Sequence, residues 1–295
     1  MRAGRSSKTA EQNALFRALE TIRSRAPNPI VDPLAFAFLS PPLRWVAVLG
    51  RSRLAHPLVV GFIDRRWPGV RSSVVARTRL IDEIVQEAVS STGQAVLLGA
   101  GFDSRPYRLS CLRVGSVFEV DHPATQRRKR AKLEQARVSR PDVRFVATDL
   151  RIGGLDEALA AAGFDPKRPT LFIWEGVTNY LPADAVDATL RWCAGAAAGS
   201  HLVFTYVDRS VLCDPSQYHG AERVLATSRR AGEAVTFGMD PEEVPAYLSE
   251  RGLVLITDTG ASSYRETYYG AAARNIRGHE FYRVAHAYIA PVAIA

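Results

Sequence analysis

From residue 94 onward, short apolar runs alternate with longer stretches of helical periodicity, and this alternation constrains the fold more than any other feature. The six runs are AVLLG from residue 95, SVFEV from 116, VRFVAT from 143, TLFIW from 170, HLVFTYV from 201 and LVLIT from 253. Apolar runs of this length are typical of buried strands, and the helical stretches between them are long enough to be crossover connections. The sequence therefore predicts an α/β fold with a mostly parallel sheet and helices on both faces.

Two further features complete this predicted sheet. A seventh run, FYRVAHAYIA from residue 281, alternates apolar and polar residues and is expected to form an antiparallel last strand, which makes a seven-stranded sheet. The connection over residues 208–250 is much longer than the connections usual in compact α/β units. We therefore expect it to form an inserted cap with a functional role.

The chain before the first run shows helical patterns only. Residues 9–26 and 72–90 carry apolar side chains at three- and four-residue intervals, with Thr9 as the expected N-cap of the first helix. Asp32 and Pro33 stand where the cap and first turn of another helix are expected. We predict a helical lid over residues 1–92 and an α/β core with the inserted cap over 93–295, together forming one integrated domain.

Charge and cysteine usage narrow the function classes. The net charge is +8, but the densest basic cluster, RRKRAK at 127–132, has no interleaved aromatic residues and is expected to form the solvated face of a helix. We therefore expect no nucleic-acid partner. The three cysteines have no paired spacing, and no stretch approaches the roughly 20 apolar residues that span a bilayer. These patterns predict a cytoplasmic protein without a membrane partner; oligomeric state stays open.

The turn after the first apolar run contains two glycines, within QAVLLGAGFDSRPYRL at 94–109. Ligands of open α/β sheets bind beyond the carboxyl ends of the strands, and glycine lets the backbone bend sharply and approach a ligand. Gly99 and Gly101 are therefore expected to line a ligand site. The third glycine of the dinucleotide fingerprint is replaced by Ser104, which argues against a dinucleotide.

Acidic residues end the next three runs. Asp121 lies 22 positions beyond Gly99, close to the spacing at which a carboxylate reaches a ribose diol. Asp149 could accept a hydrogen bond from an adenine amine while Leu150 packs against the ring, and Glu175 ends the fourth run. Asp121 or Asp149 could instead cap the helix that follows it. Together the three acids predict a negatively charged nucleoside pocket, which suits a cationic ligand better than a pyrophosphate.

Five motifs in this order carry a family resemblance. They are VARTRLID at 75–82, VLLGAGFDSRPYRL at 96–109, FEVDHP at 118–123, VATDL at 146–150 and WEGVTNYLP at 174–182. The set resembles the S-adenosylmethionine-dependent methyltransferases of the leucine carboxyl methyltransferase and polyketide O-methyltransferase family, which has many actinobacterial members. The resemblance extends over about residues 8–207. It implies the Rossmann-like class I methyltransferase fold, with the N-terminal helices folded over the cofactor, S-adenosyl-L-methionine.

The resemblance also implies roles for individual residues. The implied cofactor contacts are Arg77 at the methionine carboxylate with Arg79 as its rival, Gly99 and Gly101 along the methionine moiety, Asp121 at the ribose, Asp149 and Leu150 at the adenine, and Glu175 near the amino group or the sulfonium.

The function predicted from these features is O-methylation of a carboxylate or hydroxyl on a small molecule. The candidates for contact with this acceptor are Asn179, Tyr180, Tyr206, Asp208, Tyr218 and His219. No pair of histidines has metal-ligand spacing, so we expect no catalytic metal. The alternatives are an NAD(P)-dependent oxidoreductase and a non-catalytic protein that binds nucleotides or nucleic acid.

Overall fold

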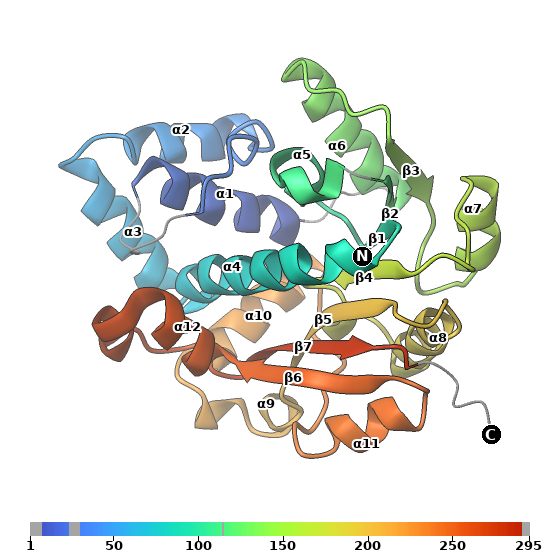
Figure 1. Ribbon diagram of the computed structural model, residues 1–295. Coiled ribbons are helices and arrows are strands. Elements are labelled where there is room, and N and C mark those ends of the chain that lie inside the picture. Colours follow the sequence, from blue (N-terminus) through green and yellow to red (C-terminus); the bar gives the residue numbers. More distant parts are fainter. Residues whose placement is uncertain (1–7, 24–29, 114, 291–295) are drawn as a thin grey trace.

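A seven-stranded sheet forms the centre of the molecule (Figure 1). The computed structural model describes residues 8–23, 30–113 and 115–290. The strands are β1 (Gln94–Leu98), β2 (Ser116–Asp121), β3 (Val143–Ala147), β4 (Thr170–Trp174), β5 (His201–Val207), β6 (Val254–Gly260) and β7 (Tyr282–Tyr288). They lie in the order β3-β2-β1-β4-β5-β7-β6. β1 to β5 pair in parallel, and β7 is antiparallel to both β5 and β6. The predicted α/β fold, its seven strands and the antiparallel last strand are confirmed.

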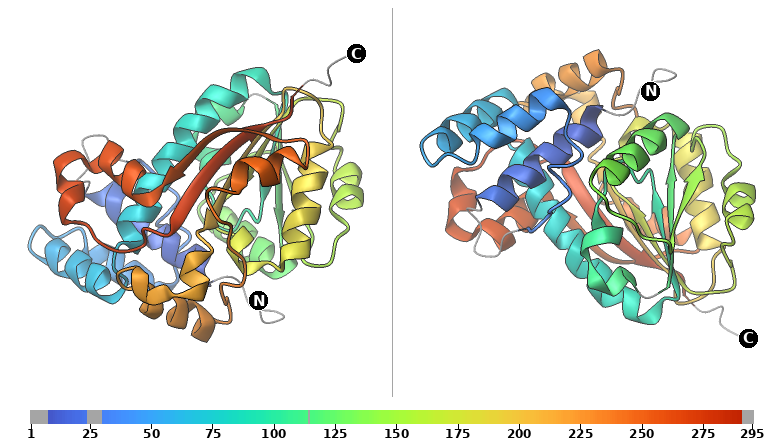
Figure 2. Two further views of the ribbon diagram at one scale, coloured as in Figure 1. Left: turned by 90° about the horizontal axis from the view of Figure 1, so that it is seen from below. Right: turned by 90° about the horizontal axis from the view of Figure 1, so that it is seen from above.

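Alternate residues of the central strands face two separate apolar cores. Ala95 and Leu97 of β1 belong to one core, and Val96 and Leu98 belong to the other. The first core includes side chains of α1 (Lys8–Ile22), α4 (Val70–Ala88) and α12 (Ala261–Tyr269). The second includes side chains of α7 (Leu155–Ala161), α8 (Ala183–Ala194) and α11 (Val244–Ser249). Helices therefore cover both faces of the sheet, as Figure 2 shows, because the central strands β1, β4 and β5 are apolar on both sides.

The N-terminal part is helical, with one departure from the prediction. It contains α1, α2 (Pro41–Leu49), α3 (Ala55–Arg66) and α4, followed by a short 3-10 turn, η1 (Val89–Ser91). The predicted helix over 9–26 ends at Ile22, and residues 24–26 lie outside the described part of the chain. Thr9 lies inside α1 and is not its N-cap.

The helix expected from Asp32 is wrong, because residues 33–38 form turns. The Asp32 carboxylate accepts hydrogen bonds from the backbone N–H groups of Leu34 and Ala35, as it would in a helix cap. It also binds the Arg17 guanidinium and the Ser104 hydroxyl. The Asp32 carboxylate therefore caps a turn and binds distant residues, and no helix follows it.

The basic cluster at 127–132 also departs from the prediction in part. It lies on α6 (Pro123–Gln135), where Arg127 and Arg130 are exposed but Lys129 is buried. The Lys129 ammonium lies 2.8 Å from the carboxylate of Glu119 on β2. Lys129 shares a buried helical stripe with residues four positions before and after it, so only part of the cluster is solvated.

The long connection between β5 and β6 is folded into short helices. The remaining elements, in this connection and elsewhere, are α5 (Arg105–Arg108), η2 (Ser110–Arg113), η3 (Thr178–Tyr180), α9 (Ser210–Cys213), η4 (Pro215–Gln217), α10 (Ala221–Ala231) and η5 (Gly270–Asn275). After α10 the chain returns to the sheet, where the Thr236 N–H donates to the Asn179 carbonyl oxygen at 2.9 Å. The connection thereby reaches the carboxyl edge of β4.

Candidate functional site

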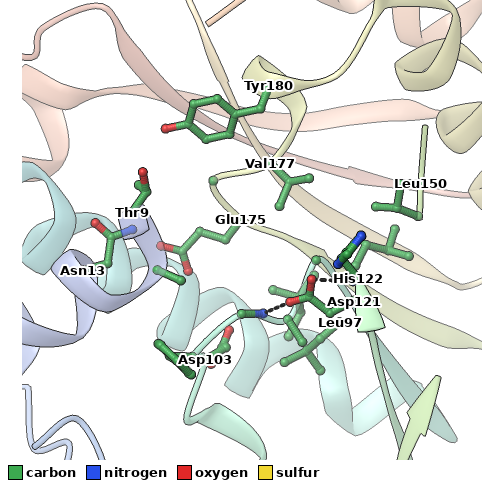
Figure 3. Close-up of a pocket in the computed structure, with 18 of the residues that line it drawn as sticks. Thr9, Asn13, Leu97, Asp103, Asp121, His122, Leu150, Glu175, Val177 and Tyr180 are labelled. Carbon is green, nitrogen blue, oxygen red and sulfur yellow. Dashed lines mark hydrogen bonds between the residues drawn. The ribbon is translucent and has the colours of Figure 1, made fainter. Parts of the chain in front are cut away.

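A cavity of about 210 Å³ lies at the carboxyl ends of β1, β2 and β4 (Figure 3). Its walls come from α1, from the turns after β1 to β4 and from residues 232–234 of the long connection. The lining residues expected from the sequence are Gly99, Gly101, Asp121, Asp149, Leu150, Glu175 and Tyr180. Segments that are far apart in the chain therefore meet at this cavity, which we term the site pocket.

The two glycines of the β1 turn have backbone conformations that suit glycine. Gly99 has φ +67° and Gly101 has φ +42°, both in the left-handed region. A Cβ atom on Gly99 would lie 2.4 Å from Cγ2 of Val177, so this position has no room for a side chain. The Gly101 N–H points at the end of β2, where it donates to Asp121 Oδ2 at 2.5 Å.

Asp121 is held by backbone groups at the floor of the site pocket. In addition to the Gly101 bond, its Oδ1 accepts from the His122 N–H at 2.6 Å. Burial raises the pKa of Asp121, and the two N–H donors partly oppose this rise. His122, whose ring accepts from the Ala124 N–H, is the N-cap of α6. The alternative role of Asp121 as a helix cap is therefore not seen.

Asp149 and Leu150 lie at the rim after β3. Asp149 accepts a hydrogen bond from Arg151 Nε at 2.9 Å, and hydrogen bonding to Arg151 lowers the pKa of its carboxyl. The helix that follows, α7, has Gly154 at its N-cap position, so Asp149 does not cap it. Leu150 and Val177 project into the site pocket near His122 and supply apolar surface there (Figure 3).

Glu175, at the end of β4, is fixed by two arginines. Arg77 Nε lies 2.8 Å from Oε1, and Arg105 Nη1 lies 2.7 Å from Oε2. Burial opposes ionisation of Glu175, but the charges of Arg105 and Arg77 overcome it and lower its pKa to about 2. Arg77 is itself buried against the ring of Tyr282 and does not line the site pocket. Its rival Arg79 pairs with Glu83 and is also absent from the lining.

Sequence analysis missed a group of arginines in the pocket wall. Arg17 pairs with Asp32 at 2.8 Å, and Arg105 and Arg108 each pair with Asp82 at 2.7 Å. The charged lining residues are Asp103, Asp121, Asp149, Glu175 and Glu233 together with Arg17, Arg105, Arg108 and Arg151. The negative charge expected of the pocket is therefore largely offset, because five acids face four arginines. Arg105 follows the glycine turn directly, but isolated arginines give no sequence signal of burial.

Tyr180 projects into the site pocket from the side opposite α1 (Figure 3). Burial raises the pKa of its hydroxyl. Thr9 and Asn13 of α1 line the same region, and the Thr9 hydroxyl and N–H both donate to the Glu233 carboxylate. Glu233 and α1 had no sequence signal that linked them, because they are joined only by the folded chain.

The other proposed acceptor contacts lie outside the site pocket. Asn179 is buried, and its side-chain oxygen has no hydrogen-bond partner among the described residues. Tyr206 is buried on the other face of β5, where its hydroxyl donates to Asp258 on β6 at 2.6 Å. Asp208, Tyr218 and His219 are also absent from the lining. The described residues contain no group of three or more His, Cys, Asp or Glu side chains placed to hold a metal ion.

Sequence comparisons with known proteins all point to methyltransferases. The profile of the family described as leucine carboxyl methyltransferase matches residues 10–194. A Frankia alni protein named as a candidate S-adenosyl-L-methionine-dependent methyltransferase is 41% identical over 208 residues, which cover 69% of this chain and 70% of that protein. A Streptomyces avermitilis protein with the same kind of name is 40% identical over 215 residues, with coverage of 69% and 70%.

Solved structures support the fold. The crystal structure of a candidate methyltransferase from Thermobifida fusca superposes with a TM-score of 0.61 at 16% identity, and the match covers 98% of this chain and 97% of that one. A Streptomyces avermitilis protein superposes with a TM-score of 0.59 at 14% identity, with coverage of 97% and 98%. At this identity the likeness concerns the fold alone.

Proposed function

Because the chain belongs to the leucine carboxyl methyltransferase family, whose relatives above are named for dependence on S-adenosylmethionine, we propose that its site pocket holds this cofactor beside a small-molecule acceptor. The enzyme is a methyltransferase, and the proposed reaction is O-methylation of a hydroxyl or a carboxylate. This reading replaces the NAD(P)-dependent oxidoreductase and the non-catalytic protein considered from the sequence.

The observation that carries the assignment of the pocket is the bond between Gly101 and Asp121. It joins the glycine turn after β1 to a carboxylate after β2, inside a cavity whose floor has no room for a side chain at Gly99. The residues fit an adenosyl group: Asp121 has lone pairs left to accept from ribose hydroxyls, and Leu150 and Val177 offer apolar surface to a flat ring. We place Asp149 at the adenine edge.

The charged residues fit the other end of the cofactor. Glu175, kept ionised by Arg77 and Arg105, supplies negative charge for an ammonium or sulfonium group. Arg77 acts through Glu175 as a positioning residue. We assign the cofactor carboxylate to the pocket-lining guanidinium groups of Arg17 and Arg105. S-adenosylmethionine supplies an activated methyl group on its sulfonium when bound.

The chain contributes orientation and exclusion of water to the transfer. α1 and residues 232–234 cover the site pocket on the side away from the sheet. Holding an acceptor in line with the methyl group can lower a barrier by roughly 7–11 kcal/mol in favourable cases. We propose that the predicted lid over residues 1–92 and the cap over 208–250 have this role, and that catalysis needs no covalent intermediate with the protein.

The wall formed by Thr9, Asn13, Tyr180 and Glu233 is the proposed acceptor side, and Glu233 favours a hydroxyl acceptor over a carboxylate. Among the described residues, Glu233 accepts hydrogen bonds from Thr9 and makes no ion pair. A carboxylate without a cation repels an anionic acceptor but can take the proton of a hydroxyl. Tyr180 can orient the same acceptor oxygen by hydrogen bonding.

Transfer of a radiolabelled methyl group from S-adenosylmethionine to matched panels of phenols and aromatic carboxylic acids tests the proposal. We expect labelled phenol ethers, and in Glu233→Gln a loss of roughly 100-fold or more in kcat at neutral pH with unchanged affinity for S-adenosylhomocysteine. Label found only in methyl esters, with Glu233→Gln as active as the parent, would overturn the hydroxyl assignment. Absence of S-adenosylhomocysteine binding would overturn the pocket assignment itself.

A further inference from the structure

The exposed apolar side chains of this protein are concentrated on one helical hairpin. Seven of the ten large hydrophobic residues that are exposed in the described chain are Val31, Trp45, Val48, Leu49, Leu54, Leu58 and Phe62. All but Val31 belong to α2, α3 or the turn between them. A patch of neighbouring exposed apolar residues is unusual on a soluble monomer and marks an interaction surface.

The hairpin holds these side chains on its outer side. Leu54, Leu58 and Phe62 recur every four residues and are 87%, 75% and 69% exposed, so they form one stripe along α3. The opposite side of α3 is buried through Val60 and Ile63. α2 and α3 lie at the edge of the molecule, away from the strands (Figures 1 and 2).

The same hairpin is strongly basic. Residues 41–66 contain five arginines, Arg44, Arg51, Arg53, Arg65 and Arg66, and a single acid, Asp64. The Asp64 carboxylate is already engaged by Arg71 at 2.9 Å. Arg51 and Arg53 stand at the tip of the hairpin, beside the exposed Leu54, and both are exposed. Exposed leucine and aromatic residues next to arginines are typical of helices that lie in the surface of an anionic membrane.

We propose that the outer face of the α2–α3 hairpin, which we term the hairpin face, docks on a lipid bilayer that carries anionic headgroups. Trp45, Leu54, Leu58 and Phe62 enter the boundary between headgroups and acyl chains, and the exposed arginines Arg51, Arg53 and Arg65 bind the lipid phosphates. No helix in the described ranges is long and apolar enough to cross a bilayer, so the contact is with the surface only. No membrane partner was expected from the sequence because no apolar stretch is long enough to span a bilayer. Contact with the membrane surface needs no such stretch.

Charge favours a membrane over a second copy of the chain. A symmetric contact between two hairpin faces would place the same arginines against each other, with few acids to offset them. An anionic bilayer supplies apolar interior and negative charge together. The inference does not depend on the acceptor, because the hairpin face is separate from the lining of the site pocket.

Sedimentation of the full-length protein with vesicles tests this proposal. Vesicles of phosphatidylcholine with phosphatidylglycerol should bind the protein, and vesicles of phosphatidylcholine alone should bind it at least tenfold more weakly. Binding should weaken when the ionic strength rises from about 0.1 M to about 1 M, because the screening length falls from about 10 Å to about 3 Å.

Two double variants, each with a control, separate the apolar and the electrostatic contributions to vesicle binding. Leu58→Glu with Phe62→Glu should weaken binding by roughly tenfold or more, whereas Ile152→Glu, at an apolar residue 82% exposed elsewhere, should bind like the parent. Arg51→Gln with Arg53→Gln should weaken it by roughly fivefold for each arginine removed. Arg168→Gln with Arg191→Gln, at exposed arginines outside the hairpin, should change binding by less than half as much.

Each variant is first checked for an unchanged melting temperature and an unchanged response to S-adenosylhomocysteine, which keeps this test separate from that of the methyltransferase site. Equal binding to both vesicle types, no binding to either, or equal losses in the control variants would overturn the proposal. A dimer in solution that Leu58→Glu dissociates, detected by light scattering without vesicles, would also overturn it and assign the hairpin face to a second copy.

Discussion

Asp121 is the residue on which the placement of the cofactor depends most. A ligand present at 100 times its Kd stabilises a protein by roughly 2.7 kcal/mol, so S-adenosylhomocysteine should raise the melting temperature of the parent. Asp121→Ala should lose most of this increase, because it removes the proposed acceptor for the ribose and the partner of the Gly101 N–H. Differential scanning fluorimetry measures the effect, with Glu157→Ala on the exposed side of α7 as the control. An Asp121→Ala protein that responds like the parent would refute the ribose assignment.

Glu175 makes the stability of the protein depend on pH in the acid range. Its pKa falls from 4.5 to about 2 on folding, so its stabilising contribution is complete above pH 4.5 and is lost as the pH falls through about 2. The shift corresponds to about 3 kcal/mol. Glu175→Gln should therefore be less stable than the parent by about this amount at pH 7, and the difference should shrink below pH 4.5.

Urea unfolding of both proteins between pH 7 and pH 2.5 checks this prediction for Glu175. Glu243→Gln is the matched control, because it removes an exposed ion pair with Arg209 that contributes no more than about 1 kcal/mol. A difference between parent and Glu175→Gln that stays constant across this pH range would contradict the account.

Tyr206 shows where residue-level prediction fails. The sequence places it near the carboxyl end of β5, where ligand contacts are expected, but does not say which face of the sheet it joins. The structure places it with Phe204 in the second core and gives its hydroxyl to Asp258. Tyr206→Phe should therefore destabilise the fold by about 1 kcal/mol through the lost hydrogen bond to Asp258, which keeps its pair with Arg283, and leave the Kd for S-adenosylhomocysteine unchanged in calorimetry. A tenfold change in that Kd would mean that Tyr206 does contribute to the ligand site.

At the scale of elements, the turn after β1 makes the sharpest prediction. Gly99→Ala adds a Cβ that would lie 2.4 Å from Val177 and has to adopt φ +67°. We expect a loss of about 1–2 kcal/mol from the backbone and a further 1–3 kcal/mol from crowding, with weaker binding of S-adenosylhomocysteine. Adding Val177→Ala should recover the stability lost through crowding but not the stability lost through the backbone conformation.

Chemical unfolding of the parent, the two single variants and the double variant measures this coupling between positions 99 and 177 as a double-mutant cycle. Additive losses would mean that the side chain of Val177 does not limit the space at Gly99.

The elements themselves were largely predictable from the sequence. Every strand of the sheet overlaps one of the predicted runs. The signal is clearest for β1, β4 and β5, because strands buried on both faces have few polar positions to interrupt the run. Residues 33–38 were not predictable, since Arg17 and Ser104 hold Asp32 from elsewhere in the chain. The pocket arginines and Glu233 were missed for the same reason: their partners are set by tertiary structure and not by spacing.

On the scale of the whole molecule, the sheet edge provides the site and two other parts of the chain enclose it. α1 supplies Thr9, Asn13 and Arg17, the connection over 208–250 supplies Glu233, and the Thr9–Glu233 hydrogen bond joins the two across the site pocket. The family match over residues 10–194 includes α1 from Ala10 onward but neither Thr9 nor Glu233. We therefore infer that the cofactor side of the site is set by the matched part of the chain, and that the acceptor side combines Asn13 and Tyr180 of that part with Thr9 and Glu233 outside it.

The most direct test of this account is a crystal structure of the protein with S-adenosylhomocysteine. The account predicts the ligand in the site pocket, with an oxygen of the Asp121 carboxylate within about 3.2 Å of a ribose hydroxyl and the adenine against Leu150. A ligand bound elsewhere, or one in the pocket whose ribose does not contact Asp121, would contradict it.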